Sequence, residues 1–390
     1  MADKKQTNIF LAVTFIYWMA LYTYVPNLTP YALDPAGAIV ATGTVTGIIT
    51  GAYGFMQMLL RVPLGILSDR LNKRKIFVML GLFLASVSAL GMYLARSGIT
   101  LAIFRGISGA AASSWVVFSV MFSGYFPPEA SAKAIGRVTS ANMAGQMVAM
   151  LLGGWISNTY GQGMAFMAAV ILGGVGLVLA LLLKENNAGS SPATLADVVS
   201  VGKDKNLLRV SALGIVIQLI AFGTVYGFTP EIATNLGATN AQLGILSTLA
   251  VVPGIFVAML TGGKFIQKIG VYRFLGIAFV FTAIATAATF LARNMATLYV
   301  LQLLGGMGRG MVLPLLMSLC IETVPTRLRS TAMGFFQALY SVGMFIGPVV
   351  MGIIRDYVGL SAGFIILAAI ALFSGAVCFF FFHRNKPNKA

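Results

Sequence analysis

The feature that most constrains this chain is a series of twelve apolar runs, each long enough for a helix to cross the ~30 Å hydrocarbon core of a bilayer. The runs cover residues 8–30, 41–66, 76–95, 99–123, 134–157, 162–183, 207–230, 240–263, 272–292, 296–320, 331–354 and 360–382. A membrane β-strand would need only about ten residues of alternating polarity. The runs therefore predict an all-α polytopic membrane protein with twelve transmembrane helices.

The charge composition agrees with a protein surrounded by membrane lipid. Only 9% of the 390 residues are charged, whereas a soluble domain carries about 25%. The net charge of +16 would suit a nucleic-acid-binding protein, but the basic residues form short clusters between the apolar runs. Nucleic-acid binding needs a basic stripe on a polar surface instead, so we expect no nucleic-acid partner.

The distribution of Lys and Arg predicts the topology. With the N-terminus placed in the cytoplasm, 20 of the 26 basic residues fall in inner segments, as the positive-inside rule requires. The basic residues of the outer segments are Arg96, Arg293 and Arg355. The first run is too long for the apolar region of a signal peptide. We therefore expect a multi-pass protein of the cell inner (plasma) membrane, with both termini cytoplasmic.

The chain divides into two similar halves. A polar stretch, 184–206, predicts a cytoplasmic linker between six-helix bundles at 1–183 and 207–390. An offset of 197 or 198 residues aligns the halves across five separate runs. The aligned pairs include Gly65 with Gly263, Gly109 with Gly306, Gly154 with Gly352, and Asn158 with Asp356. Repeated bundles of this kind enclose a solute pocket near the bilayer midplane.

Several residue types that carry enzyme chemistry are nearly missing. Cys320 and Cys378 lie inside apolar runs, and the single histidine, His383, lies in the basic tail. These residues offer neither a disulfide framework nor a metal site. An intramembrane enzyme would need a catalytic histidine, a metal cluster or paired carboxylates. We expect no enzyme activity, no metal and no cofactor.

The segment 65–75 reads GILSDRLNKRK and resembles the loop motif G-x-x-x-D-R-x-G-R-R of the major facilitator superfamily. Asn72 replaces the second glycine of the motif, and asparagine tolerates the left-handed backbone conformation. The resemblance implies that Asp69 faces the N-terminus of the eleventh helix. It further implies a conformational latch that joins the halves when the transporter opens outward. The residues of this latch are Gly65, Asp69, Arg70 and Arg74.

Two further segments resemble motifs of the drug–proton antiporter branch, which has twelve helices. Residues 101–109 read LAIFRGISG, similar to L-x-x-x-R-x-x-x-G, whose arginine (here Arg105) is associated with proton coupling. The antiporter motif G-x-x-x-G-P-x-x-G-G is only partly kept in the fifth run, where Ala149 and Met150 replace its Gly-Pro pair. The resemblance implies a monomeric secondary active transporter that works by alternating access, with proton-linked efflux of amphipathic compounds as its leading function.

Three arginines, Arg61, Arg105 and Arg309, lie inside apolar runs, where a cation costs about 2.5–3.5 kcal/mol or more. None of the ten acidic residues lies in the middle of a run. The arginines therefore contact water, backbone carbonyls, amides such as Gln57 and Gln302, or the substrate. Arg61 could also extend to the inner surface. These arginines support an alternative function, the uptake or exchange of an organic or inorganic anion.

In the superfamily, helices 1, 4, 7 and 10 line the cavity with help from helices 2, 5, 8 and 11. The substrate-binding candidates on these helices are Arg61, Arg105, Arg309, Tyr17, Tyr22, Gln57, Asn142, Gln146, Gln218, Tyr226, Gln302, Gln337 and Tyr340. For each one the alternative is a helix–helix contact or an interfacial aromatic belt. The proton-coupling candidates are Glu231 and Asp34, which are repeat mates at outer helix ends.

Overall fold

A computed structural model describes residues 4–127, 130–185, 194–254, 256 and 269–382, and every regular element within these ranges is helical. The N-terminal half contains α1 (Lys4–Tyr22), α2 (Val25–Leu33), α3 (Gly43–Leu71), α4 (Arg74–Leu94), α5 (Gly98–Ser113), α6 (Trp115–Ser123), α7 (Ser131–Tyr160) and α8 (Met164–Leu181). The C-terminal half contains α10 (Lys205–Gly223), η2 (Thr224–Phe228), α11 (Thr229–Asn235), α12 (Asn240–Leu249), α15 (Val271–Thr289), α16 (Met295–Leu319), η3 (Thr326–Leu328), α17 (Arg329–Tyr357), α18 (Leu360–Val377) and η4 (Cys378–Phe382).

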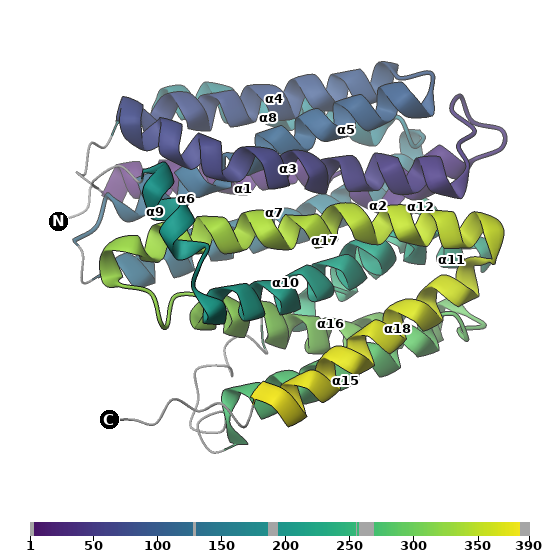
Figure 1. The fold of residues 1–390 in the computed structure, drawn as a ribbon. Helices are drawn as coiled ribbons and strands as arrows, with labels where there is room; N and C mark the ends of the chain where they lie inside the picture. Colours follow the sequence, from purple (N-terminus) through teal and green to yellow (C-terminus); the bar gives the residue numbers. More distant parts are fainter. Residues whose placement is uncertain (1–3, 128–129, 186–193, 255, 257–268, 383–390) are drawn as a thin grey trace.

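The all-α prediction is confirmed, and eleven of the twelve predicted runs coincide with these helices. The eighth run, 240–263, begins as α12, and most of its remainder lies outside the described residues. Within the described part of the chain, nine helical segments are long and apolar enough to cross a bilayer. The helices lie roughly side by side in one elongated bundle (Figure 1).

Local chemistry explains where several helices begin and end. The Thr42 and Ser97 side chains accept hydrogen bonds from the first turns of α3 and α5, which satisfies N–H groups that have no partner inside the helix. Asn72 ends α3 at φ 50° and ψ 33°, so the left-handed conformation expected from the loop motif is confirmed. Gly161 and Gly359 follow α7 and α17 at φ 95° and 107°, which makes the two repeat mates equivalent turns.

The predicted linker, 184–206, is partly helical in its described residues. It contains α9 (Leu195–Val201), whose first turn is closed by reciprocal hydrogen bonds between Thr194 and Asp197. The following helix, α10, begins at Lys205, two residues before the predicted boundary, because Asp204 caps it. The linker was predicted from polarity alone, which does not detect so short a capped helix.

The two halves meet through close glycine contacts at two places, between α3 and α17 and between α7 and α12, and the two contacts are equivalent. In α17, a Cβ added to Gly352 would lie 2.2 Å from the carbonyl oxygen of Gly43 in α3. In α7, a Cβ added to Gly154 would lie 2.8 Å from the carbonyl oxygen of Asn240 in α12. These two contacts are related by the 197–198-residue offset of the repeat. The sequence repeat is therefore also a repeat of inter-helix contacts.

The α3–α17 contact is uneven along its length. The helices lie side by side at the end of the molecule that holds α11 and α12, here called the outer end, and separate toward the opposite, inner end (Figure 1). At the outer end a Cβ on Gly47 would lie 2.3 Å from the Pro348 carbonyl oxygen. Toward the inner end, a Cβ on Gly334 would meet nothing within 4 Å, and one on Gly65 would meet only Val116 of its own half.

Candidate functional site

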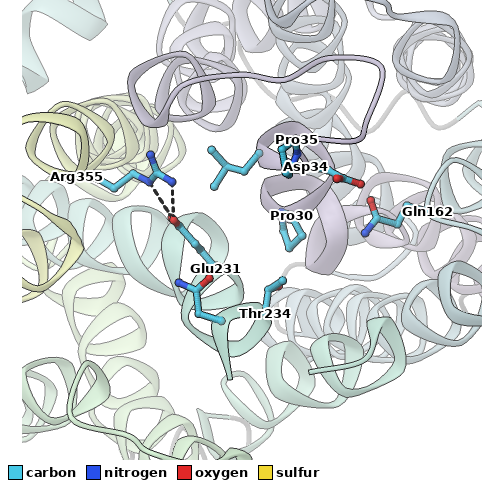
Figure 2. A pocket seen from close by; sticks show the side chains of 9 residues that line it. Pro30, Asp34, Pro35, Gln162, Glu231, Thr234 and Arg355 are labelled. Carbon is cyan, nitrogen blue, oxygen red and sulfur yellow. Dashed lines mark hydrogen bonds and ion pairs between the residues drawn. The ribbon is translucent and has the colours of Figure 1, made fainter. Parts of the chain in front are cut away.

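A cavity of about 340 Å³ lies at the outer end, between the two halves. Its lining residues are Pro30, Leu33, Asp34, Pro35, Gln162, Glu231, Thr234, Asn235 and Arg355. Figure 2 shows Asp34 and Gln162 on one side of this space and Glu231 with Arg355 on the other. The structure thus brings the two predicted proton-coupling candidates to one cavity.

A chain of ionic and hydrogen bonds runs from Glu231 to the start of α3. Arg355 donates to both carboxylate oxygens of Glu231, at 2.7 and 3.2 Å (Figure 2). Its Nη1 donates to Asp356 at 3.0 Å. Asp356 in turn accepts hydrogen bonds from the backbone N–H groups of Gly43 (2.9 Å) and Thr44 (2.7 Å) and from the Thr44 hydroxyl (2.8 Å). A carboxylate at a helix N-terminus is stabilised by the unpaired N–H groups there. This network fastens the C-terminal half to the N-terminal half.

The pseudo-equivalent contact between α7 and α12 contains only neutral groups. The Asn240 amide donates to the Ser157 carbonyl oxygen and accepts from Gln162, both at 3.3 Å. Asn27 of α2 donates to the Ser157 hydroxyl at 3.1 Å. Both halves therefore meet at the outer end through polar contacts, and the charged ones lie on the α3–α17 side.

Arg61 joins the halves at a deeper level. Its Nη1 donates to Gln337 at 2.8 Å and to the Tyr340 hydroxyl at 2.7 Å, both on α17. Its Nη2 donates to Gln57, one turn earlier on α3, so the expectation of an amide partner for this arginine is confirmed. The side chain does not extend to the inner surface, because Arg61 is only 4% exposed. That alternative is wrong, and the reason is the set of acceptors that α17 presents.

Arg105 is bonded inside the N-terminal half. It donates to the Tyr24 hydroxyl at 3.0 Å and to Ser108 at 3.1 Å. Its guanidinium lies 4.2 Å from the centre of the Tyr53 ring, within the range of a cation–π interaction. Arg105 thus has three protein partners and no carboxylate among them.

Arg309 has a different environment. No hydrogen bond or ion pair of its side chain exists among the described residues, and its Nη2 is buried without a partner. Gln302, one of the alternative partners considered for the arginines, donates to Thr289 of α15 at 3.5 Å. Its role in substrate binding stays a prediction.

Aromatic rings meet across the halves at mid-height. Tyr22 of α1 contacts Tyr226 of η2 edge-on at 6.1 Å, and Tyr53 of α3 is stacked on Phe222 of α10 at 6.0 Å. Tyr226 belongs to a five-residue π-helix that interrupts the seventh span, and such segments are frequent at functional sites. The rings of Phe222 and Tyr226, four residues apart along this span, lie 4.9 Å from each other.

The remaining substrate-binding candidates lie within single halves. The Tyr17 hydroxyl donates to the Ala111 carbonyl oxygen and its ring is stacked on Phe118 at 4.5 Å. Asn142 and Gln146 bond to each other along α7. Gln218 is half-buried on α10. These contacts give each residue a place in the packing, and their roles in substrate binding stay predictions.

The residues of the predicted latch lie at the inner end of α3. Asp69 pairs with Arg74 at 3.1 Å, inside the N-terminal half, and Arg70 is exposed. The start of α4, next to this pair, is capped by Glu185, which accepts from the backbone N–H groups of Arg74 and Lys75 at 2.9 and 3.0 Å. The latch was predicted for an outward-open transporter, and in this structure the outer end is closed.

Sequence reasoning missed the outer network around Arg355 and Asp356. Arg355 was counted only as an outer loop charge, and Asp356 was noted only as the repeat mate of Asn158. The available signal was the exchange of a neutral Asn158 for a charged Asp356 at the end of a repeated helix. A carboxylate added at one of two equivalent helix ends suggests a helix N-terminus nearby.

Comparison with known proteins decides the family. The Major Facilitator Superfamily model matches residues 10–210 and again 211–390. The chain belongs to the major facilitator superfamily. It is therefore a multi-pass membrane protein and a secondary transporter, not an enzyme, and the transporter expectation is confirmed at this level.

Relatives and solved structures match over nearly the whole chain. An uncharacterized MFS-type transporter of Methanocaldococcus jannaschii is 25% identical over 96% of this chain and 98% of its own. The quinolone resistance protein NorA of Staphylococcus aureus is 22% identical over 90% of each chain. A crystal structure of a bacterial homolog to the human lysosomal transporter Spinster, inward-facing and unoccupied, superposes with a TM-score of 0.81 over both full chains at 16% identity.

Proposed function

We propose that this transporter exports small amphipathic compounds in exchange for protons. The observation that carries the proposal is the group of aromatic rings at mid-height, where Tyr22 meets Tyr226 and Tyr53 meets Phe222 across the two halves. Flat apolar faces with phenol hydroxyl groups suit ligands that combine rings with a few polar atoms. The relatives named as drug resistance proteins, NorA among them, support the same substrate class.

The proton-coupling role belongs to Glu231 in this proposal. The carboxylate lines the outer cavity together with Asp34 and is held by Arg355. A protonated Glu231 cannot keep the bidentate ion pair with Arg355, because one oxygen then carries a proton. Loss of this pair frees Arg355, which also bonds to Asp356, so proton binding from outside weakens the contact that Asp356 makes with α3. The protonated carboxyl group still passes through the outer-closed state to release its proton inside, and exchange requires that the proton and the exported compound do not bind together.

The test is a flux measurement in inside-out vesicles that contain the purified protein. An acid interior should drive accumulation of norfloxacin, a zwitterionic amphipathic quinolone, and collapse of the pH gradient should abolish it. Glu231→Gln should bind norfloxacin but lose the dependence on the gradient. Glu322→Gln, at an exposed position on the inner side, is the matched control and should behave as wild type. Accumulation that ignores the pH gradient in the wild type would refute proton exchange.

The second candidate function is uptake or exchange of an organic or inorganic anion. Arg309 favours it, because this cation has no partner among the described residues. The same vesicles discriminate between the two functions, since anion exchange needs a counter-anion inside and continues without a pH gradient.

A further inference from the structure

Three arginines lie inside helices of the bilayer region, and their bonding differs sharply. Arg61 has three side-chain acceptors, and Arg105 has two hydroxyl partners and a tyrosine ring. Arg309 has none among the described residues, although its Nη2 is buried. The side chain as a whole is partly exposed, but a buried cationic N–H group without an acceptor is destabilising. The position therefore favours a negative charge that no described residue provides.

The orientation of Arg309 can be read from its helix. On α16, Val300 is 53% exposed and faces the surroundings of the protein. Nine residues correspond to two and a half turns of an α-helix, so Arg309 points in the opposite direction, toward the interior. The guanidinium lies over Gly305, where an added Cβ would come within 2.7 Å of Nη1. A glycine at this position leaves the charged group room inside the bundle.

The interior that Arg309 faces holds α10, which packs against α16 and leads directly into the π-helix with Tyr226. Tyr226 contacts Tyr22 of the other half. The rings to which the substrate was assigned therefore belong to a direct neighbour of the helix that carries Arg309. No described ion pair joins a carboxylate to Arg309, since the pairs all involve Arg74, Arg327 or Arg355 at the two ends of the molecule.

We infer that Arg309 binds the acidic group of the transported compound, so that the substrates are amphipathic organic anions or zwitterions with a carboxylate, sulfonate or phosphate. Arginine offers a planar fork of N–H groups that matches these groups in two parallel hydrogen bonds. The apolar part of the same molecule would lie against Tyr226 and Tyr22. This inference rests on the proposed efflux function and adds the charge of the substrate to it.

The first test needs no ligand. If Arg309 lacks a protein partner, Arg309→Gln removes an uncompensated charge, and the purified apo protein should melt several degrees higher than wild type. Arg61→Gln should melt lower, because it leaves Gln57, Gln337 and Tyr340 unsatisfied. Arg293→Gln, at an exposed outer loop, is the matched control and should melt as wild type. A lowered melting temperature for Arg309→Gln would mean a structural role and would overturn the inference.

The second test compares two fluorescent probes that differ in one group, 1-pyrenebutyrate and 1-pyrenebutanol. The wild type in neutral detergent should bind the carboxylate at least ten times more tightly than the alcohol. Arg309→Gln should bind both about equally, Arg309→Lys should keep part of the preference, and Arg293→Gln should keep all of it. An unchanged preference in Arg309→Gln, or no preference in the wild type, would overturn the inference.

An acidic lipid headgroup carries the same chemistry, so a third arm adds phosphatidylglycerol or phosphatidylcholine to the purified protein. Phosphatidylglycerol that raises the melting temperature of wild type but not of Arg309→Gln, with no such effect of pyrenebutyrate, would assign the site to lipid and overturn the substrate assignment. These binding results are independent of flux. Vesicles that fail to use a pH gradient refute proton exchange, whereas Arg309→Gln binding both probes as wild type does refutes the present inference alone.

Discussion

The two ends of the α3–α17 contact are built differently, although the same two helices form both. At the outer end, glycines bring the backbones of α3 and α17 into close contact. The Asp356 carboxylate there accepts hydrogen bonds from the first turn of α3. At the inner end, Asp69 pairs with Arg74 inside its own half, and the glycines of the two helices do not meet. The closed end is thus held by contacts between halves, and the open end keeps its charges within one half. A rocking motion has to break the first set before it can form another at the inner end.

The largest effect on the difference between the two ends is expected from a bulky side chain in the outer α3–α17 contact. Gly47→Leu places a side chain where its Cβ alone would lie 2.3 Å from the Pro348 carbonyl oxygen. Overpacking costs about 1–3 kcal/mol, and here the cost falls only on the outer-closed state. We expect transport to fall at least tenfold and an outer cysteine to become more reactive toward a membrane-impermeant maleimide.

The control for this change is Gly334→Ala on α17, where an added Cβ meets nothing within 4 Å. Its transport and labelling should match wild type. Equal losses in both variants would show that glycine flexibility, and not close approach, matters at these positions.

A smaller effect is expected from removing the carboxylate that caps α3. Asp356→Asn weakens the bonds to Gly43 and Thr44, and a capping interaction of this kind is worth about 0.5–2 kcal/mol. The outer end should open more often, which maleimide labelling of an outer cysteine would detect. The repeat mate provides the control, since Asn158→Ala removes an exposed amide and should leave labelling unchanged.

The inner end gives the opposite prediction. If Asp69 belongs to a latch that forms in the outward-open state, Asp69→Asn should reduce labelling at the outer end, because the outward-open state loses its stabilising contact. The measurement is the same maleimide assay, combined with the melting temperature. More labelling at the outer end would contradict the latch, and the pair with Arg74 would then be local.

The smallest effect is expected where the linker helix α9 meets the loop before α17. Thr194 hydrogen bonds, and then the guanidinium of Arg327 at 2.7 Å, lower the pKa of Asp197 below its usual value. A lowered pKa means a stabilising contribution that is complete above the ordinary aspartate pKa of about 3.9 and is lost as the pH falls further. Asp197→Asn should remove this pH dependence from amide exchange in α9, with little change in transport. An unchanged acid response in Asp197→Asn would place its origin elsewhere.

The sequence was sufficient for the features that depend on local pattern. Hydrophobic length predicted the helices, the repeat offset aligned Gly154 with Gly352, and the motif predicted the left-handed Asn72. It was not sufficient for contacts between distant side chains. Nothing in the sequence around Arg61 indicates that Gln337 and Tyr340 accept hydrogen bonds from it. The register between α3 and α17, which decides this contact, is set by the packing of the whole bundle.

The same limit explains the outer network and the contrast among the arginines. Arg61, Arg105 and Arg309 look alike in the sequence, as single cations in apolar runs. Whether such a cation finds acceptors depends on the neighbouring helices, which present amides and a hydroxyl to Arg61, hydroxyls to Arg105 and, in the described part of the chain, no acceptor to Arg309. Three-dimensional structure therefore separates a bonded arginine from one that is available to a ligand.

The most direct test of the account measures two distances in one protein by pulsed electron spin resonance. Spin labels at Val40 and Tyr357, both exposed at the outer end, report the closed contact, and labels at Leu71 and Ser330, exposed at the inner end, report the open one. The account predicts that acidification or Asp356→Asn lengthens the outer distance and shortens the inner one together. Two distances that change in the same direction, or an outer distance that stays fixed during transport, would contradict alternating access by rocking of the two halves.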